Sequence, residues 1–223
     1  MMELHLTLIG DASFAGGEGV AGLLDSELQH DACGQPYLRG RSLKGLLAEE
    51  CTNLLDSLRR QGDNLAKERL EVAASALFGI PGADASSQGG LNIADAQLPA
   101  DLRAAIKRDI QSNRLTPNEV LESLSAIRRR TAMNDQGAPL AGSLRSMRVL
   151  LRQTCLIAGL SFSQGPNQDQ RALLAACTMS LRRGGSDRNR GLGRLRVRLY
   201  EVGADATDTY WDSFKGILTE TKP

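Results

Sequence analysis

Two segments of the sequence combine glycine with basic residues in a way suited to phosphate binding. Residues 184–194 read Gly-Gly-Ser-Asp-Arg-Asn-Arg-Gly-Leu-Gly-Arg, with four glycines and three arginines in eleven positions. Glycine lets backbone N–H groups approach a ligand closely, and arginine supplies a forked, charged donor for phosphate oxygens. A helix-to-strand turn needs only one or two glycines, so we predict an anion-binding loop here. Its predicted contact residues are Arg188, Arg190, Gly191, Gly193 and Arg194.

The second segment, residues 36–45, reads Pro-Tyr-Leu-Arg-Gly-Arg-Ser-Leu-Lys-Gly. Ser42 is a predicted N-cap, and Lys44 falls in the first turn of the helix that follows. A lysine there opposes the helix dipole unless an anion occupies the helix N-terminus. The segment therefore predicts a second anion site that includes Arg39, Ser42 and Lys44, with an ordinary capped helix start as the alternative.

Arginine is concentrated in two windows. Residues 182–198 hold seven arginines and one acid, Asp187, and residues 126–152 hold six arginines and one acid, Asp135. Removing these thirteen arginines and two aspartates from 27 basic and 26 acidic residues leaves 14 bases and 24 acids elsewhere. This segregation, with no lysine in either window, indicates a surface for a polyanion such as nucleic acid on an acidic body. A merely solvated face would mix the two signs and use more lysine.

Composition narrows the class of protein. The chain has 223 residues, of which 41% are hydrophobic and 24% are charged, and these values are typical of a folded globular protein. No apolar run approaches the roughly 18 residues of a membrane span, and the first ten residues lack a basic leader, so we expect a cytoplasmic protein with no membrane partner. Four isolated cysteines and two histidines argue against a zinc knuckle or a disulfide framework.

The elements that must position these segments follow from the hydrophobic pattern. Leu4, Leu6 and Leu8 alternate with polar residues and predict a strand over residues 2–10, and leucines at helical spacing predict a helix from Ser42. The other predicted elements are a helix over 65–78, a strand over 90–98, helices over 101–111 and 117–130, a loop or hairpin over 131–142, a strand over 148–162 bent at Gly159, a helix over 169–181, a strand over 195–202 and a helix over 209–219.

Without the segment between the second and third strands, the order is β-α-β-β-α-β, an α+β, ferredoxin-like arrangement. We expect residues 1–99 and 143–223 to form this domain and residues 100–142 to form an insertion. Sheets of the RNA-recognition type stack bases on aromatic side chains of the central strands. Only Phe162 and Tyr200 of the eight aromatic residues fall near those strands. RNA binding, if present, is therefore expected through loops, backbone and arginines. Because both lie beside the core sheet in a ferredoxin-like fold, we expect the segments at 36–45 and 184–194 to converge on one groove for the RNA backbone.

The motifs, taken in order, resemble the RAMP superfamily of CRISPR-associated proteins, which are built on modified RNA-recognition folds. Residues 36–45 resemble its P-Y-(I/L)-x-G-(S/R)-S-L-K-G motif, and residues 190–195, Arg-Gly-Leu-Gly-Arg-Leu, resemble its glycine-rich loop. Residues 22–31 resemble the G-x-x-D-x-x-x-x-R-D segment of the repeating backbone subunit of type III effector complexes, with His30 in place of the usual arginine. Residues 131–133 and 142–145 resemble the thumb of the same subunits.

The resemblance implies a subunit that polymerises head to tail along a guide RNA and displaces bases of the guide–target duplex with its thumb. Implied partners are guide RNA, target RNA, further copies of the chain, and large, small and capping subunits. Active relatives cut target RNA at an aspartate that corresponds to Asp25, which is thus the implied catalytic and metal-binding residue, with Mg²⁺ or Mn²⁺ bound transiently. The implied RNA contacts of the thumb are Arg130, Met133 and Arg145.

Three other functions remain open from the sequence. The chain could be a structural subunit that binds guide RNA without cutting, or a precursor-RNA processing endonuclease with His30 as general acid or base. A single-domain RNA-binding protein outside CRISPR systems would also fit the fold and charge. A chelator distinguishes the two possible cutting mechanisms. Cleavage by Asp25 with a bound metal should stop, whereas cleavage by His30 needs no metal and should continue.

Overall fold

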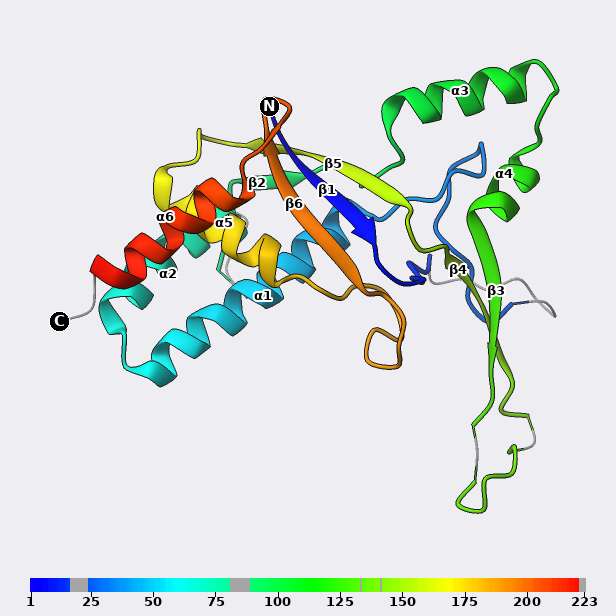
Figure 1. The fold of residues 1–223 in the computed structure, drawn as a ribbon, viewed down its shortest axis with the longest axis horizontal. Coiled ribbons are helices and arrows are strands. Elements are labelled where there is room, and N and C mark those ends of the chain that lie inside the picture. Colours follow the sequence, from blue (N-terminus) through cyan, green and yellow to red (C-terminus); the bar gives the residue numbers. More distant parts are fainter. Residues whose placement is uncertain (17–23, 81–88, 133, 141, 221–223) are drawn as a thin grey trace.

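The structure is a computed structural model that describes residues 1–16, 24–80, 89–132, 134–140 and 142–220. Its main sheet has five strands in the order β2-β5-β1-β6-β7, and every neighbouring pair is antiparallel (Figure 1). The strands are β1 (Met2–Leu8), β2 (Leu91–Ile93), β5 (Cys155–Phe162), β6 (Leu195–Glu201) and β7 (Ala204–Asp205).

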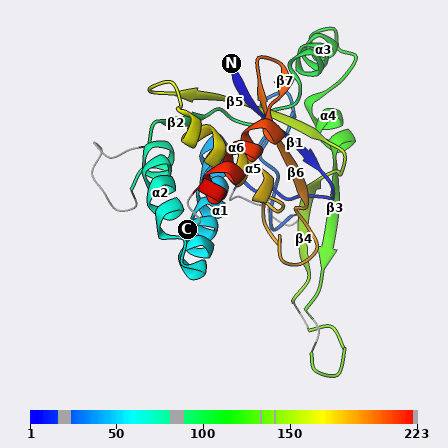
Figure 2. The ribbon, with the colours of Figure 1, turned by 60° about the vertical axis from the view of Figure 1, so that its left-hand side comes forward.

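Four helices cover one face of this sheet, as Figure 2 shows. They are α1 (Gly40–Gln61), α2 (Asn64–Phe78), α5 (Gln168–Ser180) and α6 (Thr207–Glu220). Leu4, Leu6 and Leu8 are buried against them, while the alternate β1 residues are half-buried on the other face. There His5 stacks on Tyr200 of β6 with ring centroids 3.8 Å apart.

The order β1-α1-β2-β5-α5-β6, with β1 and β5 at the centre of the sheet, confirms the predicted ferredoxin-like fold. No helix in the described part of the chain is both long and apolar enough to cross a membrane.

A separate two-stranded sheet projects away from the main domain (Figure 1). It consists of β3 (Ser125–Arg130) and β4 (Arg145–Leu150), which we call the thumb hairpin together with their connection. Helices α3 (Ala100–Gln111) and α4 (Pro117–Leu124) precede it. The predicted insertion, residues 100–142, thus ends before β4.

Three predictions about residues 117–162 were wrong. The predicted helix over 117–130 ends at Leu124, because Ser125 adopts an extended conformation and the following arginines pair with β4. The single strand predicted over 148–162 is two strands separated by a turn in which Gln153 has a φ of 70°. The expected bend at Gly159 is absent, since Gly159 pairs regularly with Glu3 inside β5.

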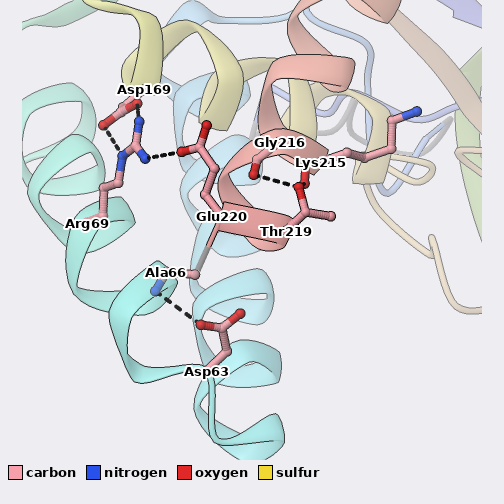
Figure 3. A network of polar contacts seen from close by, with 8 residues as sticks. All are labelled: Asp63, Ala66, Arg69, Asp169, Lys215, Gly216, Thr219 and Glu220. Carbon is pink, nitrogen blue, oxygen red and sulfur yellow. Dashed lines mark hydrogen bonds and ion pairs between the residues drawn. The ribbon is translucent and has the colours of Figure 1, made fainter. Parts of the chain in front are cut away.

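An ion network joins helices α2, α5 and α6 (Figure 3). Arg69 of α2 forms two 2.7 Å hydrogen bonds with Asp169 of α5 and one of 3.1 Å with Glu220 of α6. Asp169 and then Glu220 raise the pKa of Arg69 further above its ordinary value, although the group is largely exposed. Asp63 caps α2 by accepting from the Ala66 N–H. These contacts fix the helix layer on which the sheet rests.

The start of α1 depends on the absence of a side chain at Gly40. A Cβ atom there would lie 2.0 Å from the carbonyl oxygen of Ile93. The Gly40 N–H also donates to Asp95 Oδ1 at 2.8 Å. The helix therefore begins directly against the chain that leaves β2.

We expect Gly40→Ala to lower the free energy of unfolding by about 2 kcal/mol, because the added methyl group must displace backbone rather than a flexible side chain. Gly45→Ala, in the same helix, is the matched control. Its Cβ would meet nothing within 4 Å, so it should raise stability by about 0.5–1 kcal/mol. Urea denaturation of both variants measures the difference, and equal midpoints would contradict the packing argument.

Candidate nucleic-acid interface

The loop over residues 184–194, here called the arginine loop, crosses the chain that leaves β1. The Gly193 N–H donates to the Asp11 carbonyl at 2.8 Å, the Ser186 N–H donates to the Ser13 carbonyl at 2.8 Å, and the Gly184 N–H donates to the Gly193 carbonyl at 2.9 Å. Gly193 has a φ of 72°, and a Cβ there would lie 2.0 Å from the Gly184 oxygen. Glycine is thus required at position 193 for the loop to close on itself.

The arginine loop and the start of α1 meet at one cavity of about 290 Å³, as the sequence motifs predict. Gly185 and Ser186 line it from the loop, and Arg39 and Ser42 line it from the helix. Both helix residues are exposed. We call this hollow the loop–helix cavity.

The predicted capping arrangement at this helix was wrong. Arg39 is the N-cap, it makes no side-chain capping bond, and Ser42 lies inside the first turn. Lys44 does not face the cavity lining either, because its Nζ donates to the carbonyl of Leu91 at 2.6 Å. Burial there lowers the pKa of Lys44. The Lys44 side chain therefore links α1 to β2, and its place in the first turn of the helix is no evidence for a bound phosphate.

The arginines of the loop differ in their availability. Arg188 is held by Glu49 of α1 through hydrogen bonds of 2.7 and 2.9 Å, which raise its pKa. The Arg190 side chain is 78% exposed, with only a 4.0 Å ion pair to Asp187. Arg194 is exposed and forms no ion pair with any residue that the structure describes. Arg190 and Arg194 are thus free to contact a phosphate, whereas Arg188 must first leave Glu49.

Ion pairs attach the paired strands of the thumb hairpin to the main domain. Arg128 of β3 contacts Asp11 at 2.6 Å. Arg130 contacts Asp187 at 3.2 Å and donates to the Arg190 carbonyl at 3.1 Å. Hence the predicted contact Arg130 is a structural link between the thumb hairpin and the arginine loop.

A more buried pair lies beside these contacts. Arg148 of β4 contacts Glu27 at 2.8 Å, with side chains only 12% and 16% exposed, and Arg148 also donates to Ser125 Oγ. Because a desolvated charge is costly without its partner, this pair fixes the hairpin base to the loop before residue 28.

Asp25 lies beside the outer end of the paired strands of the thumb hairpin, where Arg145 of β4 pairs with Arg130 of β3. Its Oδ2 accepts from the Ser146 N–H at 2.7 Å, and its Oδ1 lies 3.3 Å from Arg145 Nη1. The Ser146 hydrogen bond, with a smaller contribution from Arg145, lowers the pKa of Asp25, so the carboxylate is ionised at neutral pH. The side chain remains 44% exposed and Arg145 remains 71% exposed. An RNA strand that runs along the paired strands of the thumb hairpin can therefore reach both charges.

Other implied residues lie elsewhere or outside the description. Asp31 caps a turn by accepting from the N–H groups of Cys33 and Gln35 at 2.9 Å. His30 is exposed, with Nδ1 3.0 Å from the Asp31 carbonyl oxygen, and in the described part of the chain its ring bonds neither a tyrosine nor a lysine. Met133 lies outside the described residues.

The residues around Asp25 offer few ligands for a divalent metal. Within the described residues, no group of three or more acids, histidines or cysteines is placed to hold one. Asp25 offers one carboxylate, and Mg²⁺ commonly takes one or two protein carboxylates plus phosphate oxygens and water. The site therefore fits a metal that RNA phosphates help to hold, and not a preformed all-protein centre.

Comparison with known proteins places this arrangement in a family. The sequence profile of the RAMP superfamily matches residues 5–196, which is most of the chain. The chain belongs to the RAMP superfamily. No curated protein sequence matches it.

Two solved structures share the RAMP fold seen here. One is a chain of the type III-B Cmr-beta structure in the apo state, with 14% identity and a TM-score of 0.57 over 91% of this chain and 98% of that chain. The other is a chain of type III-B Cmr-beta bound to cognate target RNA, with 13% identity and a TM-score of 0.61 over 89% of this chain and 97% of that chain. At this identity the likeness establishes the fold.

Sequence reasoning missed the acids that organise this RAMP surface. Asp11, Glu27 and Glu49 lie far along the chain from the arginines that they hold, and only the fold brings them together. The overall acidity outside the two arginine windows was the one available signal. Asp187 was visible inside the arginine loop, yet its contact with Arg130 depends on the unpredicted strand β3.

We expect Asp11→Asn to lower the free energy of unfolding by about 1–2 kcal/mol at neutral pH. The Asp11 carboxylate accepts from Arg128 and from the Arg152 N–H, and its side chain is only 16% exposed. Burial alone would raise the pKa of Asp11, but these hydrogen bonds and nearby charges lower it overall.

The depressed pKa fixes the sign of the pH dependence. The carboxylate stabilises the fold above its unfolded-state pKa, and this contribution is lost as the pH falls through the lower folded-state pKa. Parent and Asp11→Asn stabilities should therefore converge below pH ~4. Asp135→Asn, in the exposed connection of the thumb hairpin, is the control and should match the parent at every pH. A constant gap between parent and Asp11→Asn would show that charge is not the cause.

Proposed function

We propose that this RAMP protein is the repeating backbone subunit of a type III CRISPR effector complex. It binds guide RNA, polymerises head to tail along it and cleaves bound target RNA at regular intervals in antiviral defence. One observation carries the proposal: two glycine- and arginine-bearing segments meet at a single cavity, and an ionised, accessible aspartate lies against the paired strands of a projecting hairpin.

The proposed partners follow from this surface and from the fold relatives. The likeness to type III-B Cmr-beta bound to cognate target RNA supports target RNA as a ligand and other effector subunits as neighbours. Guide RNA is assigned to the surface formed by the loop–helix cavity, Arg39, Arg190 and Arg194, since phosphate contacts require accessible cations and exposed backbone N–H groups. The thumb hairpin projects from the main domain (Figure 1), and we assign to it the separation of the guide from the target.

The proposed cleavage uses the 2′-hydroxyl of the target RNA. The 2′-oxygen bonds to phosphorus while the bond from phosphorus to the 5′-oxygen breaks, which leaves a cyclic phosphate and a 5′-hydroxyl. The 2′-hydroxyl proton passes to Asp25 or to water, and water protonates the leaving oxygen. Arg145, which is mostly exposed, is placed to contact the scissile phosphate.

Asp25 alone is a weak base because its pKa is lowered. A bound Mg²⁺ or Mn²⁺ supplies charge neutralisation at the phosphate. Asp25 would hold and orient that ion from one side, and the rigid Ser146 hydrogen bond would fix the position of the carboxylate.

Two of the alternative functions predict different measurements. A structural subunit would hold target RNA without cutting it. A processing endonuclease based on His30 would cut in the presence of chelator. The absence of a tyrosine or lysine bonded to His30 in the described residues favours Asp25 over His30 as the reactive group.

We expect Arg190→Ala combined with Arg194→Ala to reduce guide RNA affinity for all sequences alike. The slope of log affinity against log salt should fall by about 2, since each arginine accounts for about one phosphate contact. Arg59→Ala combined with Arg60→Ala, at the exposed C-terminal end of α1, removes the same charge and is the control. Fluorescence anisotropy over a salt series measures both pairs. An unchanged slope in the first pair would exclude the arginine loop from the RNA interface.

We expect Asp25→Ala to reduce target RNA cleavage by about a hundredfold or more while guide binding stays near the parent value. The assay is cleavage of labelled target RNA by the assembled complex, with and without chelator. His30→Ala is the control and should cut at the parent rate. Equal cleavage by Asp25→Ala and parent complexes would remove Asp25 from catalysis, and a parent complex that binds target without cutting it would favour the structural subunit.

A further inference from the structure

The loop–helix cavity contains more than phosphate contacts require. Its wall includes Ser13, Phe14, Gln29 and Tyr37, and Arg39 is the one charged residue that lines it. A site for phosphate alone would be expected to carry several cations in its lining. A nearly neutral cavity with aromatic and amide groups is instead typical of a site for an uncharged, planar ligand group.

Ser13 supplies an independent sign that a ligand belongs in this cavity. Its side chain is fully buried, and its Oγ has no hydrogen-bond partner. A buried hydroxyl without a partner is costly, so each such group needs an explanation. Ser13 is one of the residues that line the cavity, and its unpartnered hydroxyl is the buried polar group there that a ligand would satisfy.

The neighbouring side chains are held in place for recognition. Gln29 Nε2 donates to the Tyr37 hydroxyl at 2.9 Å, which fixes the amide and leaves Gln29 Oε1 as an acceptor for a ligand N–H. The Gln29 N–H donates to the Phe14 carbonyl at 3.0 Å. The Gln29 amide and the Tyr37 hydroxyl are thus bonded to each other, and the backbone of Gln29 is bonded to that of Phe14.

The mouth of the cavity suits a phosphate. The N–H groups of Arg41 and Ser42 in the first turn of α1 find no acceptor among the described residues, and the exposed Arg39 stands beside them. A helix N-terminus with free N–H groups favours an anion. Base-like chemistry inside and phosphate chemistry at the mouth are the two halves of one nucleotide.

We infer that the loop–helix cavity takes one nucleotide of the bound RNA strand, with its base inserted against Phe14, Gln29 and Tyr37 and its phosphate at the start of α1. The inference rests on the proposed RNA-binding function and adds a base-insertion site to it. Single-stranded RNA is commonly held through splayed bases in this way. A free nucleotide has the same chemistry and is the competing source of the ligand.

The test compares a short single-stranded RNA with an abasic RNA of the same length, using the full-length protein. We expect the parent to bind the base-bearing RNA about tenfold more tightly, the effect of losing one inserted base. Ala15→Phe fills the cavity from an exposed position of its lining and should abolish this preference while keeping the affinity for abasic RNA within about twofold. Ser57→Phe, at an exposed position of α1, is the control and should keep the preference.

Ser13→Ala gives a second readout. Removing a hydroxyl that has no partner should leave the unfolding free energy unchanged or slightly higher, yet it should weaken binding of the base-bearing RNA severalfold.

The outcomes separate the inference from the function on which it rests. An equal preference for base-bearing RNA in Ala15→Phe and the parent would overturn base insertion and leave phosphate binding intact. Nucleoside 5′-monophosphates that bind as tightly as RNA, and lose binding in Ala15→Phe, would assign the cavity to a free nucleotide. No binding of either RNA by the parent would overturn the proposed function itself.

Discussion

The arrangement of the candidate site depends on Asp11, the residue at which three parts of the molecule are joined. Its carbonyl oxygen accepts from Gly193 of the arginine loop, while its carboxylate holds Arg128 of the thumb hairpin and the Arg152 N–H between β4 and β5. Asp11 follows β1, a central strand of the main sheet, so its three contacts anchor these segments to the sheet. The loop, the hairpin and the sheet thus keep a fixed geometry although they are far apart in the sequence.

A second constraint is the placement of acids beside arginines. Asp25, Glu27 and Glu49 each hold one arginine of the basic surface. Without these partners, thirteen arginines in two windows would repel one another and splay the hairpin from the loop. With them, the paired arginines shape the surface, and a smaller exposed set that includes Arg190 and Arg194 remains available to a ligand.

How much the sequence predicts differs between the fold and the site. Leucine alternation in β1 and leucine spacing in α1 predict the main domain, because burial of one face imposes those periods. Residues 125–130 carry no such period, and their strand exists only through pairing with β4. The glycine and arginine motifs predict where the loop and the start of α1 meet. They do not reveal that Lys44 turns toward Leu91 or that Ser13 is left without a partner, because both depend on packing between distant segments.

The internal pairing of arginines has a consequence for the ion atmosphere around bound RNA. When a free arginine meets a phosphate, a cation leaves the RNA and enters bulk solvent, which is the origin of salt-sensitive binding. When Arg188 leaves Glu49 for a phosphate, the abandoned carboxylate recruits a cation in its turn, and the net release is close to zero. Paired arginines therefore add shape and direction to the interface with little salt sensitivity. A surface of this composition holds RNA across a wider range of ionic strength than its arginine content suggests.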